Sequence, residues 1–211
     1  RSQHPLDTDA AADLALPKMD DSDTAAWSAL RGLFQSEDTL GLLLRDHVIQ
    51  RLVTHVDNLH KASAPPSALA TRPLAGALQV EAGEGGEHIA AANAARYAPY
   101  VQAFTAVDPA AAAKAYVRFY PLIQQAYVES GHPQGYFNDR LVAVIDHLLD
   151  TPEPARPLAV QRDERGRYRF VDPALQSRSV GQKLLLRMSA EQAQAVKQTL
   201  RQIRTAITRG V

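Results

Sequence analysis

Apolar residues recur at the spacing of an α-helix in several separate stretches of this chain, and this pattern constrains the fold more than any other feature. The clearest stretch carries Ile49, Leu52, Val53, Val56 and Leu59, which fall on one face of a helix. The chain also holds 36 alanines against 13 aromatic residues, and alanine is the strongest helix former. We therefore predict helices near residues 23–35, 46–60, 93–107, 109–130, 138–148, 180–188 and 189–207, with a short helical turn at 37–44.

Individual residues mark where these helices begin or bend. Asn138 is placed to cap the helix that follows it, and the S-x-x-Q spacing from Ser189 to Gln192 is typical of a capping box. Pro121 falls inside the predicted helix 109–130, where it removes a backbone donor and clashes with the carbonyl of Val117. We expect a kink or a break at that point.

Strand patterns are short and few. Residues 158–162 and 167–171 alternate around the four-residue loop 163–166, which predicts a β-hairpin. The long connection 61–86 also allows a short strand at 77–80, with the glycine-rich tip as a turn. The predicted fold class is mainly α, a single helical domain of about six to seven helices with a small β-hairpin element.

We place this single domain at residues 19–209. Residues 1–18 are polar and alanine-rich, contain Pro5 and Pro17, and show no apolar period, so we expect a flexible tail or spacer there. Because the sequence begins with Arg1 and not with methionine, we expect a cut or processed product from which any signal or anchor has been lost.

Composition excludes several classes of function. Lys and Arg number 23, as do Asp and Glu, so the basic excess of most nucleic-acid binders is missing and we expect no nucleic-acid partner. The sequence has no cysteine, which excludes disulfides, thiolate metal sites and a cysteine nucleophile. The longest aliphatic cluster, 40–44, is far shorter than the roughly 20 residues of a membrane helix. Histidine spacing and phosphate-loop motifs give no support for a metal or a cofactor, and we expect neither.

Three carboxylates could carry acid–base chemistry. Asp139, Asp146 and Asp150 fall on one helix face, opposite an apolar stripe, and His147 adjoins them in sequence. Paired carboxylates suit general acid–base or metal chemistry. The alternative is a solvated or ion-paired face, which amphipathic helices ordinarily have.

Aromatic and basic residues are also unevenly distributed. Nine of the 13 aromatic residues lie between residues 97 and 137, and such a cluster either lines a groove for a peptide or glycan or forms core. Lys197, Arg201 and Arg204 form a basic stripe on the last predicted helix. That stripe could pair with the acidic residues near the start of the chain, or meet anionic lipid or an acidic partner.

Six strings, in this order, make the sequence similar to a known family: LPKMDDSD (16–23), RLVTHVDNL (51–59), NAARYAPYV (93–101), YPLIQQAY (120–127), GYFNDRL (135–141) and GQKLLLRM (181–188). Together they resemble an uncharacterised proteobacterial family, domain of unknown function three thousand and fourteen, from about residue 16 to 207. The resemblance implies an envelope protein with one N-terminal membrane helix, a proline-rich spacer ending at residues 1–15, and a domain on the periplasmic side of the inner membrane. Any membrane contact would then pass through an N-terminal anchor that is absent from this chain.

Polar residues within these strings are the candidate binding residues, because a lone charge beside an apolar helix face is costly to bury. Together with two tyrosines of the aromatic cluster they are Arg51, Asp57, Asn58, Arg96, Tyr97, Tyr120, Asn138, Asp139, Arg140, Asp146, Lys183 and Arg187. We expect an inter-helix network in which Arg51, Arg96, Arg140 or Arg187 pairs with Asp57, Asp139 or Asp146, and the two asparagines satisfy backbone ends. The alternative is that the same residues converge on a cleft.

The resemblance and the missing catalytic motifs favour a non-catalytic, envelope-facing binding or scaffold domain. Its partner would be another envelope protein or a cell-wall component. The alternative function is a hydrolase of unrecognised type that uses Asp139, Asp146 or His147 as acid or base near the tyrosines. A third hypothesis is a basic helix that docks on anionic lipid.

Overall fold

The computed structural model describes residues 1–9 and 15–208, so residues 10–14 of the predicted tail and residue 209 of the predicted domain lie outside the described residues. Within this part, the chain is 57% helical and forms nine α-helices and a small four-stranded sheet, which confirms the mainly α prediction. The helices are α1 (Asp23–Leu33), α2 (Glu37–Leu42), α3 (Val48–Asn58), α4 (Ala94–Thr105), α5 (Pro109–Glu129), α6 (Phe137–Leu149), α7 (Pro173–Gln176), α8 (Val180–Arg187) and α9 (Ala190–Thr208).

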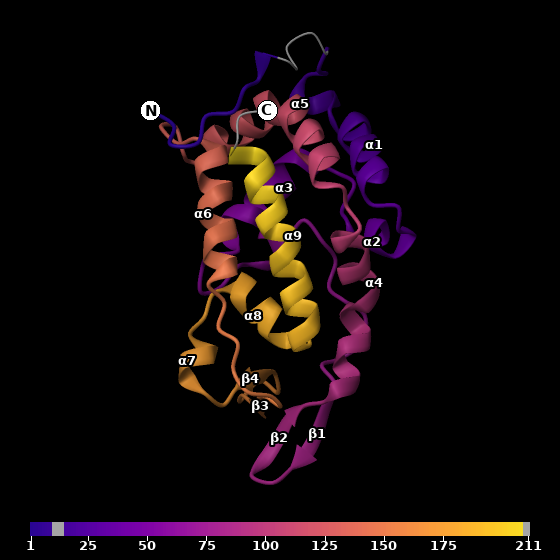
Figure 1. The fold of residues 1–211 in the computed structure, drawn as a ribbon, viewed down its shortest axis with the longest axis vertical. Coiled ribbons are helices and arrows are strands. Elements are labelled where there is room, and N and C mark those ends of the chain that lie inside the picture. The colour runs from indigo at the N-terminus through magenta and orange to yellow at the C-terminus, as the bar shows by residue number, and fades with distance from the viewer. Residues whose placement is uncertain (10–14, 209–211) are drawn as a thin grey trace.

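The long C-terminal helix α9 organises the bundle. It packs against α4, α5 and α6, while α3 packs against α1, α5 and α6 on the other side of α5 and α6. In Figure 1 α9 runs along the length of the bundle, from the end that carries the sheet to the end where the N-terminus lies. The sheet and the N-terminus therefore lie at opposite ends of the domain.

Three groups of buried side chains form the core. The first lies between α4, α6, α8 and α9, the second between α1, α3, α5 and α6, and the third under the sheet. Leu186, with 1% of its surface exposed, joins α8 to the third group. Each helix buries the apolar stripe that its sequence predicts, so burial of these stripes is the main source of stability.

The antiparallel sheet has the order β1 (Val80–Gly83), β2 (Gly86–Ile89), β3 (Ala159–Arg162) and β4 (Tyr168–Phe170). Strands β3 and β4 are the predicted hairpin. A second hairpin, β1–β2, pairs with β3, and its first strand begins at Val80 and so shares only that residue with the strand predicted at 77–80. The reason is the turn, because Gly85 and Gly86 have φ of +88° and +130° and so reverse the chain after Gly83.

The structure corrects two local predictions: the predicted Asn138 cap was wrong, and of the kink or break predicted at Pro121 the break does not occur. Asn138 does not cap α6, which begins one residue earlier at Phe137. Its buried Nδ2 donates instead to the carbonyls of His4 (2.7 Å) and Ile207 (3.3 Å) and so joins three separate segments. Helix α5 runs through Pro121 without a break. Only one backbone hydrogen bond is lost to the proline, and packing of α5 against α3 and α9 compensates for it.

Two capping contacts connect the helices. Ser189 and Gln192 form the predicted capping box of α9, with reciprocal hydrogen bonds of 3.0 and 3.1 Å. Asp23, at the start of α1, accepts hydrogen bonds from the backbone N–H groups of His47 (2.9 Å) and Val48 (2.8 Å). A carboxylate of α1 thereby caps the N-terminus of α3 and fixes the angle between the two helices.

Candidate functional site

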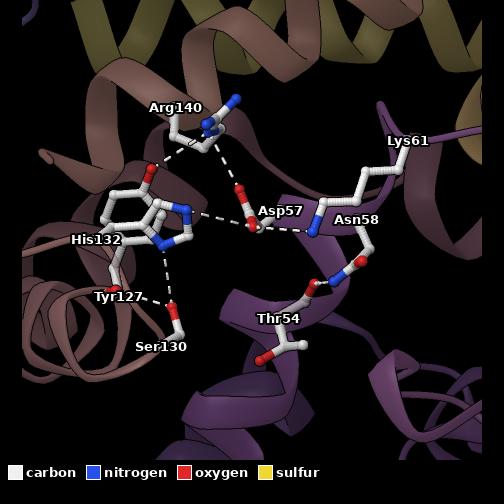
Figure 2. Close-up of polar contacts among 8 residues, drawn as sticks. All are labelled: Thr54, Asp57, Asn58, Lys61, Tyr127, Ser130, His132 and Arg140. Atoms are coloured by element: carbon white, nitrogen blue, oxygen red, sulfur yellow. Dashed lines mark hydrogen bonds and ion pairs between the residues drawn. The ribbon is translucent and has the colours of Figure 1, made fainter. Parts of the chain in front are cut away.

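Asp57, on the last turn of α3, is surrounded by three cationic or ionisable groups (Figure 2). Its side chain is 8% exposed, and its carboxylate oxygens lie 3.1 Å from Arg140 Nε, 3.6 Å from Lys61 Nζ and 3.8 Å from His132 Nε2. The Arg140–Asp57 pair joins α6 to α3, which confirms one of the predicted inter-helix pairs. A carboxylate this buried requires such partners.

Aromatic groups complete this cluster. Arg140 Nε donates its hydrogen bond to the Tyr127 hydroxyl (3.3 Å) and meets Asp57 as an ion pair. The Tyr127 hydrogen bond and the Asp57 charge raise the pKa of Arg140 above its ordinary value. The His132 ring stacks on Tyr127 with a centroid separation of 4.2 Å, as Figure 2 shows. Ser130 Oγ lies 3.3 Å from His132 Nδ1.

Ser130, His132 and Asp57 follow one another in space like the serine, histidine and aspartate of a serine hydrolase. Their hydrogen bonds, however, differ from those of such a triad. Ser130 Oγ donates to the carbonyl of Tyr127 (2.8 Å), as a residue at the end of a helix often does. The backbone N–H groups of residues 131 and 132, which would have to bind an oxyanion, both donate to the carbonyl of Val128 (3.2 and 3.3 Å). The cluster therefore acts as a structural network at the junction of α3, α5 and α6.

Asp139 binds the start of the chain. Its carboxylate accepts hydrogen bonds from Ser2 Oγ (2.9 Å), Gln3 N (3.0 Å) and His4 N (2.7 Å). Burial acts to raise the pKa of Asp139, but the hydrogen bonds from Gln3, His4 and Ser2 outweigh it and lower the pKa. Asp139 thus holds residues 2–4 against α6.

The other acid–base candidates bind in different places. Asp146 forms a bidentate pair with Arg204 of α9, with 2.9 Å between Oδ2 and Nη2, and not with any of the four arginines proposed from the sequence. His147 Nε2 lies 2.7 Å from Ser179 Oγ, at the start of α8. Asp139, Asp146 and His147 are therefore engaged within the domain, and each joins α6 to a different segment, whereas Asp150 is exposed at the end of α6.

Arg51 and Asn58 also make local contacts. Arg51 pairs with the exposed Asp46 (2.8 Å) and so is not the arginine of the predicted inter-helix pair. The side chains meet because they face each other across the start of α3. Asn58 Nδ2 donates to the carbonyl of Thr54 (2.7 Å), one turn earlier in α3, and so satisfies no free backbone end.

Most of the aromatic cluster is core. Tyr97 is 5% exposed, and Tyr120 donates to Gln124 Oε1 (3.1 Å) and accepts from Asn138 N (3.3 Å). Burial raises the pKa of Tyr116 well above its ordinary value. These tyrosines support the helix contacts and line no polar groove.

Arg96, Lys183 and Arg187 form a third polar group, between the start of α4 and α8. Arg96 donates to Asn93 Oδ1 (3.4 Å) and to the carbonyl of Gly76 (3.2 Å). Burial lowers the pKa of Arg187, and the nearby charge of Arg96 adds to this effect. Across residues 1–9 and 15–208, no carboxylate oxygen lies within 4.0 Å of these three cations. Of the four arginines offered as alternatives for the predicted pair, Arg96 and Arg187 therefore do not pair with an aspartate, whereas Arg140 does.

Several hollows lie between the described elements, and two of them stand out, one for its apolar walls and one for its size. A cavity of about 260 Å³ with almost purely apolar walls lies between α1, α3, α5 and α6. A groove of about 740 Å³ lies at the sheet end, between the end of β2, the start of α4, residues 154–158 and the junction of α8 with α9. Its walls include Ile89, Asn93, Arg156, Arg187, Met188 and Glu191. We call it the α9 groove.

The fold and its contacts define a helical domain whose predicted polar residues mostly join helices, with a separate groove at the sheet end. Residues 48–204, more than half of the chain, match the model of a family described as Protein of unknown function (DUF3014), and the chain belongs to that family. No curated protein and no solved structure matches the chain.

Two further properties concern the described residues, 1–9 and 15–208. None of their helices is both long enough and apolar enough to cross a bilayer. No group of three or more His, Asp or Glu side chains in that part of the chain is arranged to hold a metal ion.

Proposed function

We propose that this is a non-catalytic binding domain of the cell envelope, which recognises another protein or a cell-wall component on the periplasmic side of the inner membrane. The α9 groove carries this proposal. Its volume of about 740 Å³ is in the range of ligand sites, and its walls combine apolar and charged residues from four segments. The family resemblance supports the location.

The arrangement of the domain supports a presenting role. The N-terminus lies at one end of the bundle, and the end of β2 and the start of α9, which line the groove, lie at the other (Figure 1). A 19-residue helix is roughly 28 Å long. A domain anchored through a segment before Arg1 would therefore hold its groove away from the membrane, toward the periplasm.

The contacts of the acid–base candidates favour binding over hydrolysis. Asp139, Asp146 and His147 bond to the N-terminal residues, to α9 and to the start of α8. A hydrolase needs its acid and base free to exchange protons with a substrate. Two of the three residues of the basic stripe are likewise engaged, because Lys197 pairs with Glu153 (3.0 Å) and Arg204 pairs with Asp146, which leaves only the exposed Arg201 for lipid docking.

The experiment fills the groove without removing a hydrogen bond. Ala190 is exposed at the first position of α9 and lines the groove, so Ala190→Trp should obstruct it. Ala110→Trp is the matched control, because Ala110 is exposed in the first turn of α5 and lies outside the groove. Each immobilised domain is incubated with detergent-solubilised envelope and with purified cell-wall material, and circular dichroism checks the fold.

We expect wild type and Ala110→Trp to retain the same protein or cell-wall fragment, and Ala190→Trp to lose it. Equal retention by all three forms would place binding elsewhere. Retention of nothing by wild type, even after crosslinking, would contradict the proposal.

A further inference from the structure

The α9 groove gathers cationic side chains that lack acidic partners. Arg156 and Arg187 both line it, and no carboxylate oxygen of residues 1–9 or 15–208 lies within 4.0 Å of either side chain. Arg156 Nη1 donates to the carbonyl of Leu186 (3.1 Å), which leaves most of its five N–H donors for another acceptor. Arg156 therefore reaches the last turn of α8, the turn to which Arg187 belongs.

The surroundings of these cations are unfavourable without an anion. Arg96 lies directly behind the groove wall, where Asn93 accepts its hydrogen bond, and its Nε is buried with no acceptor. Burial lowers the pKa of Arg187, Arg96 lowers it further, and burial together with Arg187 lowers the pKa of Lys183. Arg187 thus lies in a partly buried place near two like charges, Arg96 and Lys183, while the acidic wall residue Glu191 lies near Arg156. Cations gathered in this way are typical of a site that an anion completes.

Backbone donors face the same place. Ser189, Ala190 and Glu191 line the groove at the N-terminus of α9. The capping box uses the N–H groups of Ser189 and Gln192 but leaves those of residues 190 and 191 without an acceptor in the described part of the chain. These donors add to the two guanidinium groups.

We propose that the α9 groove binds the terminal carboxylate of a short peptide with small side chains, held by Arg156, Arg187 and the first N–H groups of α9. This inference rests on the proposed binding function. Two arginines and Glu191 give the walls a net charge of +1, which matches a monovalent carboxylate better than a divalent phosphate. The apolar part of the walls, including Ile89, Ala90 and Met188, suits a chain of small apolar residues.

The test measures binding by isothermal titration calorimetry with three probes. Acetyl-trialanine with a free carboxylate is the ligand, its C-terminal amide is the neutral counterpart, and inorganic phosphate represents the other oxyanion. The proteins are wild type, Arg156→Gln, and Arg31→Gln as a control on an exposed arginine of α1 far from the groove. Arg187→Lys keeps the positive charge but removes the planar guanidinium, so it tests whether the carboxylate needs the paired N–H donors of an arginine.

We expect the carboxylate peptide to bind wild type and Arg31→Gln equally, and at least about tenfold more tightly than its amide, since a hydrogen bond to a charged group is worth at least this factor. Arg156→Gln should weaken binding by about tenfold, and higher salt should weaken it further. Equal binding of peptide and amide, or no binding of either, would overturn the proposal, and binding of phosphate alone would replace the carboxylate by a phosphate.

The two proposals fail differently. Ala190→Trp obstructs the groove for any ligand, whereas Arg156→Gln removes one charge and leaves the groove open. Loss of the partner with Ala190→Trp but not with Arg156→Gln would retain the binding function and refute the carboxylate.

Discussion

Replacing Asp57 by asparagine should destabilise the domain more than the loss of any single exposed ion pair would. The carboxylate is 8% exposed, with Arg140, Lys61 and His132 between 3.1 and 3.8 Å away. At these separations the attraction between Asp57 and a full positive charge, that of Arg140 or of Lys61, is about 4 kcal/mol at an effective dielectric constant near 20. Burial of the carboxylate and exposure of the cations, 31% for Arg140 and 46% for Lys61, offset most of that attraction.

We therefore expect Asp57→Asn to lower the free energy of unfolding by about 2 kcal/mol, which corresponds to a fall in Tm of about 4–8 °C for a domain of this size. Urea unfolding followed by circular dichroism measures the change. Lys61→Gln, which removes the most exposed partner, is the matched control and should cost no more than about 0.5 kcal/mol. If the two variants lose equal stability, Asp57 is not the centre of the network and the reasoning is wrong.

Two further predictions concern close packing and the N-terminal contact. Gly181→Ala should destabilise the domain by about 1–3 kcal/mol, because a Cβ there would lie 2.5 Å from Leu148 Cδ2, while Gly41→Ala has open space and should be neutral or stabilising in the same urea assay. Since the pKa of Asp139 is lowered in the folded protein, its contact should be present above the ordinary value of 3.8 and be lost as pH falls below it. Hydrogen exchange at Gln3 and His4 measures this, and protection that persists in Asp139→Asn would contradict it.

The sequence predicts the helices well because each helix needs only a local apolar period. It also predicts the Arg140–Asp57 pair, because both charges lie within apolar helical stretches, where each needs a partner of opposite sign. Ser130 and His132 were missed because they lie beyond the end of α5, where no periodicity marks them. Arg156 was missed for a similar reason, since it lies in a proline-rich connection. The α9 groove could not be predicted, because its walls come from segments that only the tertiary fold brings together.

The first hairpin shows a different limit of local patterns. Its strands are short and mostly exposed, so hydrophobic alternation is weak, and the turn glycines are the stronger signal. Asparagine is also a residue type suited to a helix cap, but the buried side chain of Asn138 donates hydrogen bonds to two backbone carbonyls, one near each end of the chain. For Asn138, long-range contacts therefore outweigh the local preference, whereas the first hairpin follows a local signal, its turn.

The pairing of β2 with β3 has a consequence for the order of folding. Glu87 is paired with Val160, and α4, α5 and α6 all lie between these residues in the sequence. Closing so long a loop costs chain entropy that only packed helices can offset. The two hairpins would join late, after the helices, and the groove beside β2 would be among the last parts of the domain to acquire its shape during synthesis.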